Sequence, residues 1–527
     1  MTVWILGDQL TREHGPLADV EPGDERVLMV EARAFARRRA YHPHKLALVF
    51  SAMRHFRNEL RDAGFTVDYR RAETFGEALD AHFDAHPGDD LVMMAPAAHG
   101  AADRLRSLVT ARGGTLDVVA NDLFLTTPEQ WEAWMDEQPY RHESFYRRVR
   151  SETGYLMDTA EQSAESPAAS EGGGEPVGGE WNYDEENRQF PGEDYDPPDP
   201  PWYEPDETTR DVLAWVEREF DGSYDTDPKG GAWADPGDFG WPVTRADALD
   251  ALERFCEERL PAFGPYQDAM LDGEWTLNHA LLSAAMNVGL LHPAEVAERA
   301  IETWRGDETP DVPLNSVEGF VRQVIGWREF VRHTYREAMP DLADANQLDA
   351  GEDLPEIYWT GETDMACLAD VVDGVRERGY SHHIERLMVL SNFALTYGVE
   401  PRQLNEWFHA AYVDAYHWVT TPNVVEMGSY GHGVFATKPY ASSANYVDRM
   451  SDYCADCPYD PDATTGEDAC PFNALYWDFL GRNEDRLRSN HRMGLVYAHW
   501  DDKDEAEREA IRERAADIRD LAETGNL

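Results

Sequence analysis

The first 120 residues alternate between short apolar runs and helix-like segments, and this alternation limits the possible folds more than any other feature. The segments between the runs, such as 43–63 and 74–85, have apolar residues at helical spacing. Such alternation is typical of βαβ units, and it predicts an open parallel sheet covered by helices. The predicted strands are 3–6, 27–31, 67–69, 91–94 and 116–119.

A candidate ligand contact follows the first predicted strand. Gly7, Asp8 and Gln9 come directly after it, and ligands of open parallel sheets bind beyond the carboxyl ends of the strands. No Gly-x-Gly-x-x-Gly opens a helix in this region, so the usual dinucleotide-binding fingerprint is missing.

The chain divides into two predicted domains. Its 527 residues exceed the size at which a single hydrophobic core stops growing, so at least two packed units are expected. We predict a Rossmann-like α/β domain over 1–130, a linker over 131–207 with an acidic insertion near 163–174, and an all-helical domain over 208–527. In the last domain the predicted helices are 246–260, 279–291, 294–305, 316–336, 364–378, 381–397, 402–416, 472–489 and 504–522.

The charge balance is strongly acidic. Asp and Glu number 102 against 47 Lys and Arg, which gives a net charge of −55, and few of the basic residues are Lys. An acidic, Lys-poor and otherwise globular composition is typical of a halophilic protein from a salty cytoplasm. At molar salt, charges are screened within about 3 Å, so the net charge does not exclude a nucleic acid as partner.

The sequence predicts neither a membrane span nor secretion. It contains no run of about 18 apolar residues, and its N-terminus lacks the basic region and hydrophobic core of a signal peptide. We therefore expect a cytoplasmic monomer. In that compartment, the five cysteines indicate metal or redox use rather than a disulfide framework.

Four of the cysteines have the spacing of a metal centre. Cys454 and Cys457 form a Cys-x-x-Cys pair, Cys470 is followed by Pro, and Cys367 lies far upstream at a predicted helix start. Four thiolates suit either a tetrahedral zinc ion or an iron-sulfur cluster, and unligated buried thiols are a third alternative. Cys256 lies on the apolar face of a predicted helix, which favours a buried thiol.

Around these cysteines the sequence resembles the iron-sulfur bacterial cryptochromes and photolyases, also called the prokaryotic (6-4) photolyases. The segments that carry the resemblance are 437–457 and 470–479. Matching segments lie upstream at 50–56, 315–329 and 358–367, so the similarity extends over nearly the whole chain.

The resemblance implies cofactors and an activity. It implies a four-iron, four-sulfur cluster on Cys367, Cys454, Cys457 and Cys470, and FAD bound within the helical domain. It also implies a 6,7-dimethyl-8-ribityllumazine antenna in the α/β domain, on Gly7, Asp8 and Gln9, although Phe35 stands where a polar contact is expected. The implied activity is light-driven repair of ultraviolet-damaged DNA, most directly of (6-4) pyrimidine photoproducts.

A flavin in a helical domain needs polar groups for its phosphates and ring edge, and a dry cavity for its ring system. Asn278 and His279 are predicted to open a helix, where backbone amides favour a pyrophosphate, although such a stretch alone is more often an ordinary capped helix start. The candidate flavin contacts implied by the resemblance are Asn278, His279, Ser283, Gln323, Trp327, Arg328, Asn392, Asp414 and Asn423.

The candidate catalytic residues are a histidine pair and several aromatic rings. Repair of a (6-4) photoproduct needs a proton donor beside the flavin, and a histidine can give and recover a proton near neutral pH. By resemblance His383 has this role, with His382 beside it and Tyr440 facing the lesion. The remaining candidates form an electron relay to the flavin, with Phe408 where relatives can carry a tyrosine; they are Trp359, Trp407 and Tyr446.

Two other functions remain open from the sequence. One is a cryptochrome-like blue-light photoreceptor that binds the same cofactors without repair. The other is a light-independent iron-sulfur protein that binds nucleic acid. The similarity to the flavin domain argues against this second function.

Overall fold

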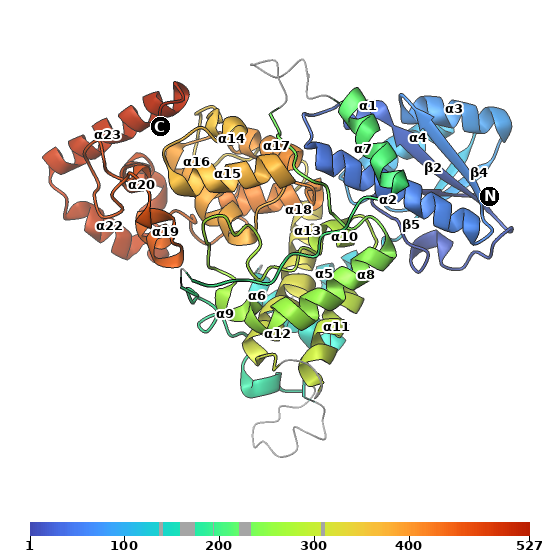
Figure 1. The fold of residues 1–527 in the computed structure, drawn as a ribbon, viewed down its shortest axis with the longest axis horizontal. Helices are drawn as coiled ribbons and strands as arrows, with labels where there is room; N and C mark the ends of the chain where they lie inside the picture. The colour runs from blue at the N-terminus through green and yellow to red at the C-terminus, as the bar shows by residue number, and fades with distance from the viewer. Residues whose placement is uncertain (136–140, 159–173, 193, 221–232, 307–310) are drawn as a thin grey trace.

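The computed structural model describes residues 1–135, 141–158, 174–192, 194–220, 233–306 and 311–527. An α/β domain lies beside a larger helical domain, and the C-terminal helices lie on the side of the helical domain away from the sheet (Figure 1). Apart from its last residue, the predicted insertion at 163–174 falls outside the described residues. None of the described helices combines the length and apolarity needed to cross a membrane.

The α/β domain contains a parallel sheet of five strands in the order β3-β2-β1-β4-β5, which confirms the predicted strands. The chain winds outward in both directions from β1, so the carboxyl end of β1 is the topological switch point. Gly7, Asp8 and Gln9 lie there, and Gln9 donates hydrogen bonds to the carbonyls of Met94 and Ala95 after β4. The strands are β1 (Thr2–Ile5), β2 (Arg26–Ala32), β3 (Thr66–Ala72), β4 (Asp90–Met94) and β5 (Thr115–Val119).

Helices cover both faces of the sheet because each face presents apolar side chains. One face packs against α3 (Phe75–Ala85) and α4 (Ala101–Thr110), and the other against α2 (Pro43–Asp62). The helix α7 (Glu207–Glu219), which the predicted boundary at 208 gives to the helical domain, packs on α2. There the ring of Trp215 lies 5.0 Å from that of Phe50.

The helical domain also contains helices from the segment 131–207 that was predicted as a linker. In particular, α6 (His142–Thr153) packs against the long helix formed by α12 (Leu314–Val321), the π-helical turn η5 (Arg322–Trp327) and α13 (Arg328–Ala338). The helices outside the sheet layers are α1 (Arg33–Ala36), α5 (Pro128–Met135), α6 (His142–Thr153), α8 (Arg245–Arg254), α9 (Leu260–Tyr266), α10 (Ser283–Asn287), α11 (Pro293–Arg305), α12 (Leu314–Val321), α13 (Arg328–Ala338), α14 (Ile357–Thr360), α15 (Ala366–Arg378), α16 (Asn392–Tyr397), α17 (Pro401–Ala411), α18 (His417–Thr421), α19 (Ala444–Met450), α20 (Pro471–Arg482), α21 (Glu484–Leu487), α22 (Gly494–Asp501) and α23 (Glu505–Glu523).

Several helices of this domain contain π-helical turns. They are η4 (Phe255–Arg259), η5 (Arg322–Trp327), η7 (Glu385–Ser391) and η8 (Pro422–Gly428). Such turns are rare and often occur at functional sites. Gln323 and Trp327 lie in η5, Asn423 lies in η8, and η7 directly follows the histidine pair, so three of these turns adjoin candidate site residues.

The prediction of a helix over 279–291 is wrong at both ends, because the helix found there covers only Ser283–Asn287. Helix α10 starts only at Ser283, and Asn278 and His279 lie in the turn before it. The side chain of Arg259 donates to the carbonyls of Leu277 and His279, which are therefore not available to a helix. Leu277 and Leu281 have positive φ angles of 40° and 57°, which are uncommon for leucine and are found at constrained sites.

The predicted helix over 402–416 also ends early, at Ala411. The backbone amide of His42 donates a hydrogen bond to the carbonyl of Ala410. The ammonium group of Lys45 donates to the carbonyls of His409 and Ala415, both at 2.7 Å. The start of α2 thus binds the end of α17 and joins the two domains.

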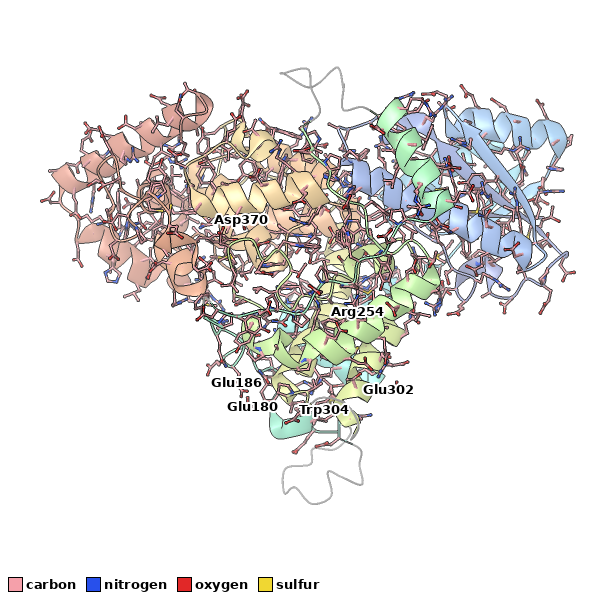
Figure 2. All side chains as sticks on the ribbon, in the orientation of Figure 1. Glu180, Glu186, Arg254, Glu302, Trp304 and Asp370 are labelled. Atoms are coloured by element: carbon pink, nitrogen blue, oxygen red, sulfur yellow. The ribbon has the colours of Figure 1, made fainter. Side chains whose placement is uncertain are left out.

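Several acidic side chains of the helical domain are exposed. Glu180, Glu186 and Glu302 are exposed and lie at the lower end of the helical domain in this view (Figure 2). Side chains of this kind stay hydrated, as expected from the net charge of −55.

Candidate functional site

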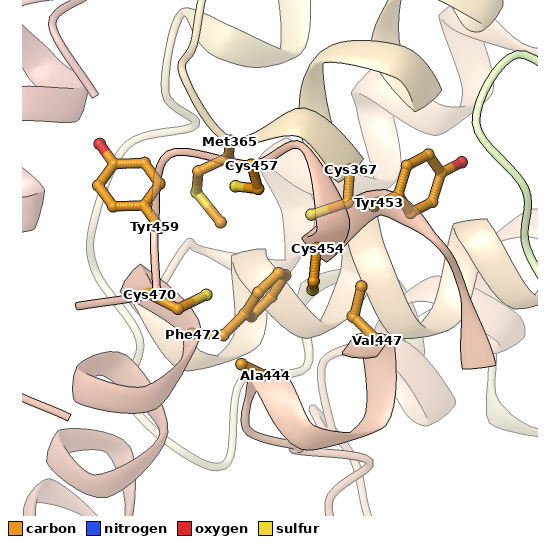
Figure 3. A pocket seen from close by; sticks show the side chains of 10 residues that line it. All are labelled: Met365, Cys367, Ala444, Val447, Tyr453, Cys454, Cys457, Tyr459, Cys470 and Phe472. Atoms are coloured by element: carbon orange, nitrogen blue, oxygen red, sulfur yellow. The ribbon is translucent and has the colours of Figure 1, made fainter. Parts of the chain in front are cut away.

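The structure brings the four predicted metal-binding cysteines into one pocket. Cys367 lies in the first turn of α15, Cys454 in the short helix η9 (Tyr453–Ala455), and Cys470 at the start of α20. With Cys457 they point into the same space, which is otherwise lined by apolar and aromatic side chains (Figure 3). Segments far apart in the sequence thus supply a single group of thiols.

Free thiols are unfavourable as anions in this pocket. The pKa of Cys454 and that of Cys470 are raised to about 12, mainly by burial and in part by the neighbouring thiols. The pKa of Cys367 is raised well above its usual value for the same reasons. Four thiolates could be held here only with a cationic centre between them.

The spacing of the thiols argues against a single zinc ion. Zinc binds sulfur at about 2.3 Å, which places the sulfurs of a tetrahedral site about 3.8 Å apart. Among the described residues, Asp68, His82 and His86 form a group of ligand atoms within 4.8 Å of one another, and the cysteines do not. A cluster that gives each thiolate its own iron tolerates wider spacing.

The group at Asp68 is explained by ion pairs. Its Oδ2 atom lies 2.8 Å from Nδ1 of His82 and also accepts from Arg70 at 2.9 Å, while Asp89 lies 3.3 Å from the other ring nitrogen of His82. Asp68 and His82, two of the three members of this group, therefore already have partners in ion pairs. Cys256 is buried in η4, outside the cysteine pocket, as predicted.

A second group of candidate residues surrounds the histidine pair. The rings of His279 and His382 stack with centroids 4.5 Å apart and planes 11° apart. Within the described chain, His382 has no aligned hydrogen-bond partner for either ring nitrogen, nor has His279 for its Nε2 atom. These buried polar atoms need partners, and a bound ligand could supply them.

His383 is accessible, although it lies deep in the helical domain. Its side chain is exposed, yet the surrounding protein lowers its pKa to about 4 by burial, and the charge of Arg386 adds to this. Burial also lowers the pKa of His382 to about 3. His383 is therefore accessible although surrounding groups desolvate it, and the space in front of its ring is called the recess below.

Arg386 organises the polar side of this recess. It donates to both carboxylate oxygens of Asp414 at 3.1 Å, and Asp414 also accepts from Ser283 at 2.7 Å. Burial raises the pKa of Asp414, but Arg386 and the hydrogen bonds outweigh burial and hold that pKa below its usual value. The sequence analysis missed Arg386; its only signal is a position one helical turn after His383.

The other predicted flavin contacts have partners within the chain. Asn278 exchanges hydrogen bonds with the hydroxyl of Tyr195, Gln323 donates to the carbonyl of Gly319, and Asn423 donates to that of Val419. Gln323 and Asn423 remain partly exposed, so their other polar atoms are free to contact a ligand.

Trp327 and Arg328 make aromatic contacts. The ring of Trp327 stacks on His142 with centroids 3.7 Å apart. The guanidinium of Arg328 lies between Phe124 and Trp418, at 4.5 and 4.8 Å from the ring centroids, and so joins the two domains. Burial lowers the pKa of Arg328 to about 10.

Asn392 holds the loop that carries Tyr440. It donates to the carbonyl of Ser442 at 3.0 Å and accepts from the amide of the same residue at 2.9 Å. Tyr440 is 38% exposed, so its ring is available to a partner at the surface.

We expect Asn392→Ala to loosen this loop, because the substitution removes both hydrogen bonds to Ser442. Hydrogen exchange of the Ser442 amide should accelerate by about tenfold, which corresponds to the net value of one or two hydrogen bonds. The matched control is Asn445→Ala, an exposed position in α19. Unchanged exchange at Ser442 would show that other contacts hold the loop.

The predicted relay residues lie in two aromatic groups. Trp407 is fully buried, with its ring 5.0 Å from that of Tyr358 and 5.1 Å from that of Phe408. Trp359 is partly exposed and lies 5.4 Å from Trp233. The third candidate, Tyr446, is partly buried in α19, and burial raises its pKa.

The residues at the sheet switch point form a narrow turn. A Cβ atom on Gly7 would lie 3.1 Å from the sulfur of Met53, so this position is tight. Burial raises the pKa of Asp8 to about 6. The side-chain amide of Gln9 already donates hydrogen bonds to the carbonyls of Met94 and Ala95 at the end of β4. Phe35 is 52% exposed and contacts Phe75.

Comparison with known proteins identifies the family. Residues 3–228 match the family model described as deoxyribodipyrimidine photo-lyase-related protein. A (6-4) photolyase of Agrobacterium fabrum is 40% identical over 523 residues, which cover 98% of this chain and 98% of that protein. This chain belongs to the photolyase family. The resemblance carried by the cysteine segments is therefore confirmed.

Solved structures show the photolyase fold. A bacterial class III photolyase from Agrobacterium tumefaciens matches with a TM-score of 0.53 and 16% identity, covering 99% of this chain and 96% of that one. A cryptochrome from Synechocystis sp. PCC6803 matches with a TM-score of 0.54 and 11% identity, covering 99% and 98%. The α/β domain followed by a helical domain is thus the fold of photolyases and cryptochromes.

Proposed function

We propose that this chain is a light-driven photolyase that repairs (6-4) pyrimidine photoproducts in ultraviolet-damaged DNA. The observation that carries the proposal is the recess lined by His383 beside the stacked His279 and His382, in a chain 40% identical to a (6-4) photolyase. Proton transfer beside an electron donor is the chemistry this repair requires.

His383 is the proposed proton donor. It would give a proton to the lesion as the oxygen or hydroxyl group returns from one pyrimidine to the other, and would recover the proton afterwards. Its pKa of about 4 applies to the protein alone, and the negative charges of a bound damaged strand would raise that pKa toward neutrality. Tyr440 would contact the lesion from the loop held by Asn392.

FAD is the proposed light-absorbing cofactor, and the unpartnered ring nitrogens around His382 fit a ligand in the recess. Bound FAD would supply the excited electron. Arg386 and Asp414 would fix the polar edge of the site and keep it closed to bulk water. The remaining proposed contacts are Asn278, His279, Ser283, Gln323, Trp327, Arg328, Asn392 and Asn423.

Trp407 and Trp359 are the proposed electron relay, with Tyr446 as a further member. Phe408 contacts Trp407 where a tyrosine would be redox-active, so the outer part of the relay must use other rings. Trp233, in contact with the partly exposed Trp359, has the position for that role.

A four-iron, four-sulfur cluster is the proposed occupant of the cysteine pocket, because the thiols are too widely spaced for one zinc ion. We expect metal analysis of the purified protein to find about four iron atoms and no stoichiometric zinc per chain. The absorption spectrum should show flavin bands with a broad shoulder near roughly 400 nm. One zinc ion per chain without iron would contradict the cluster.

Two further proposals concern the antenna and the medium. A ribityllumazine would bind at the switch point near Asp8, whose recessed carboxyl group is the polar contact there. Its release on denaturation, seen as a fluorescent compound distinct from flavin, would support this site. The acidic surface suits activity and solubility at molar salt, so assays belong in high salt.

The function is tested with defined (6-4) and cyclobutane-dimer oligonucleotides in high salt, under blue light and in the dark. We expect light-dependent restoration of the (6-4) oligonucleotide. If flavin-loaded protein repaired neither lesion, the photoreceptor function would be favoured. If the protein bound the oligonucleotides but contained no flavin, the light-independent function would be favoured.

A further inference from the structure

Glu385 is a buried carboxyl group directly behind the histidine pair. It begins η7, its side chain is 2% exposed, and its Oε2 atom accepts a hydrogen bond from the backbone amide of His382 at 2.9 Å. Its other oxygen lies 3.1 Å from Nε2 of His382. This second contact has the distance of a hydrogen bond but not its alignment.

We propose that Glu385, as a neutral carboxylic acid, is the positioning residue that fixes the ring of His382 and, through it, the place of His383 in the recess. The proposal rests on the proposed repair function only for its effect on activity. A neutral carboxylic acid offers one hydroxyl donor and one carbonyl acceptor. In Glu385 the carbonyl oxygen accepts the hydrogen bond from the backbone amide of His382, and the hydroxyl group faces the Nε2 atom of the His382 ring.

The surroundings of Glu385 favour the neutral acid. Burial raises its pKa to about 8, although hydrogen bonds from His382 and Tyr453 and the charges of Arg386 and Arg378 act in the opposite direction. Arg386 lies in η7, Tyr453 in η9 and Arg378 in α15, while His382 lies just before η7. Helix α15 also contributes Asp370, which is labelled in Figure 2 and accepts a hydrogen bond from the hydroxyl of Tyr453. The positive charges are too few or too distant to offset the loss of hydration.

The state of His382 matches this arrangement. Its pKa is lowered to about 3 by burial, so at neutral pH its ring is neutral and carries one proton. A hydroxyl donor at Nε2 places that proton on Nδ1 and so selects one tautomer. The selected ring stacks on His279, which holds both rings in one orientation next to His383.

A simpler role for Glu385 is to cap the helix that follows His382. A cap would need only the hydrogen bond to the backbone amide, and its loss would cost stability without changing proton chemistry. The two roles differ in which variants keep repair and in how stability depends on pH.

The activity test compares E385A, E385Q and the exposed control E362Q, each checked for flavin content and photoreduction. We expect E385A to repair (6-4) lesions at least about tenfold more slowly with flavin retained, because a displaced donor is costly in a site of fixed geometry. E385Q should restore most of that loss, since an amide keeps one donor and one acceptor. Repair by E385A at the parental rate, or equal loss in E385Q and E385A, would overturn the proposal.

The stability test needs no DNA and separates failure of this inference from failure of the repair function. The pKa of Glu385 is about 8 in the folded chain and about 4.5 when unfolded, so between these values the folded chain keeps a proton that the unfolded chain has lost. The parent should therefore lose stability relative to E385Q as the pH rises through this window. Parallel curves would overturn the neutral acid, even if E385A fails to fold.

Discussion

His383→Ala is expected to lower (6-4) repair by at least about 100-fold, the effect typical of a general acid-base group. The imidazole is the accessible titratable group in the recess, and alanine leaves no side chain that can give or recover a proton. Because the ring is exposed and makes no hydrogen bond or ring contact with the residues that the structure describes, FAD content, iron content and light-driven flavin reduction should stay at parental values.

The measurement is restoration of a defined (6-4) oligonucleotide under blue light, with flavin occupancy and photoreduction recorded on the same sample. The matched control is His499→Ala, an exposed position on α22 far from the recess in the sequence. A structural role for His383 would lower flavin content and soluble yield together with activity. Repair at the parental rate would refute the proposed proton donor.

The strands and most helices could be predicted because their signals are local. Strands such as β1 and β4 are short apolar runs between turns, and α11 and α23 have regular helical spacing of apolar residues. The turn at Asn278 could not be predicted, because it depends on Arg259, a residue of another element. The side chain of Arg259 donates hydrogen bonds to the carbonyls on either side of Asn278. Likewise, α7 has an ordinary amphipathic sequence, and only packing shows that α2 is its partner.

The candidate site was predictable where residue type itself carries the chemistry. Four cysteines with a Cys-x-x-Cys pair indicate a metal centre in any fold, and the pocket brings all four together. Arg386 and Glu385 carry no such signal, because charged residues one turn apart on a helix usually lie at the surface. Glu385 is buried and Arg386 partly buried, and their contacts with His382 and Asp414 are not visible in the sequence.

The cysteine pocket and the histidine recess share structural elements. Cys367 lies on α15, which also carries Asp370, and Tyr453 next to Cys454 donates to that carboxylate at 2.9 Å. Tyr453 therefore lies between the thiols and the buried Glu385 behind His382. Loss of the bound centre should thus disturb more than the C-terminal helices.

Cys454→Ser is expected to remove iron and soluble folded protein together. The pocket joins α15, η9 and α20, and without a bound centre these elements would face one another through a group of desolvated thiols and aromatic rings. A bound metal centre contributes its binding free energy to folding, and a serine hydroxyl is a poor ligand for iron. The expected result is a large fall in soluble yield, with the residual protein nearly free of iron.

Iron per chain, soluble yield and thermal unfolding measure this effect, and Cys256→Ser is the matched control. That cysteine is also desolvated, with burial raising its pKa to about 12, but it lies in η4 away from the pocket. The control should keep its iron and nearly all of its yield. If Cys454→Ser kept parental iron and stability, the thiol of Cys454 would not be a ligand. If both variants lost soluble yield but kept their iron, the loss of yield would come from burying a hydroxyl group. Only loss of iron confined to Cys454→Ser links the pocket to folding through the bound centre.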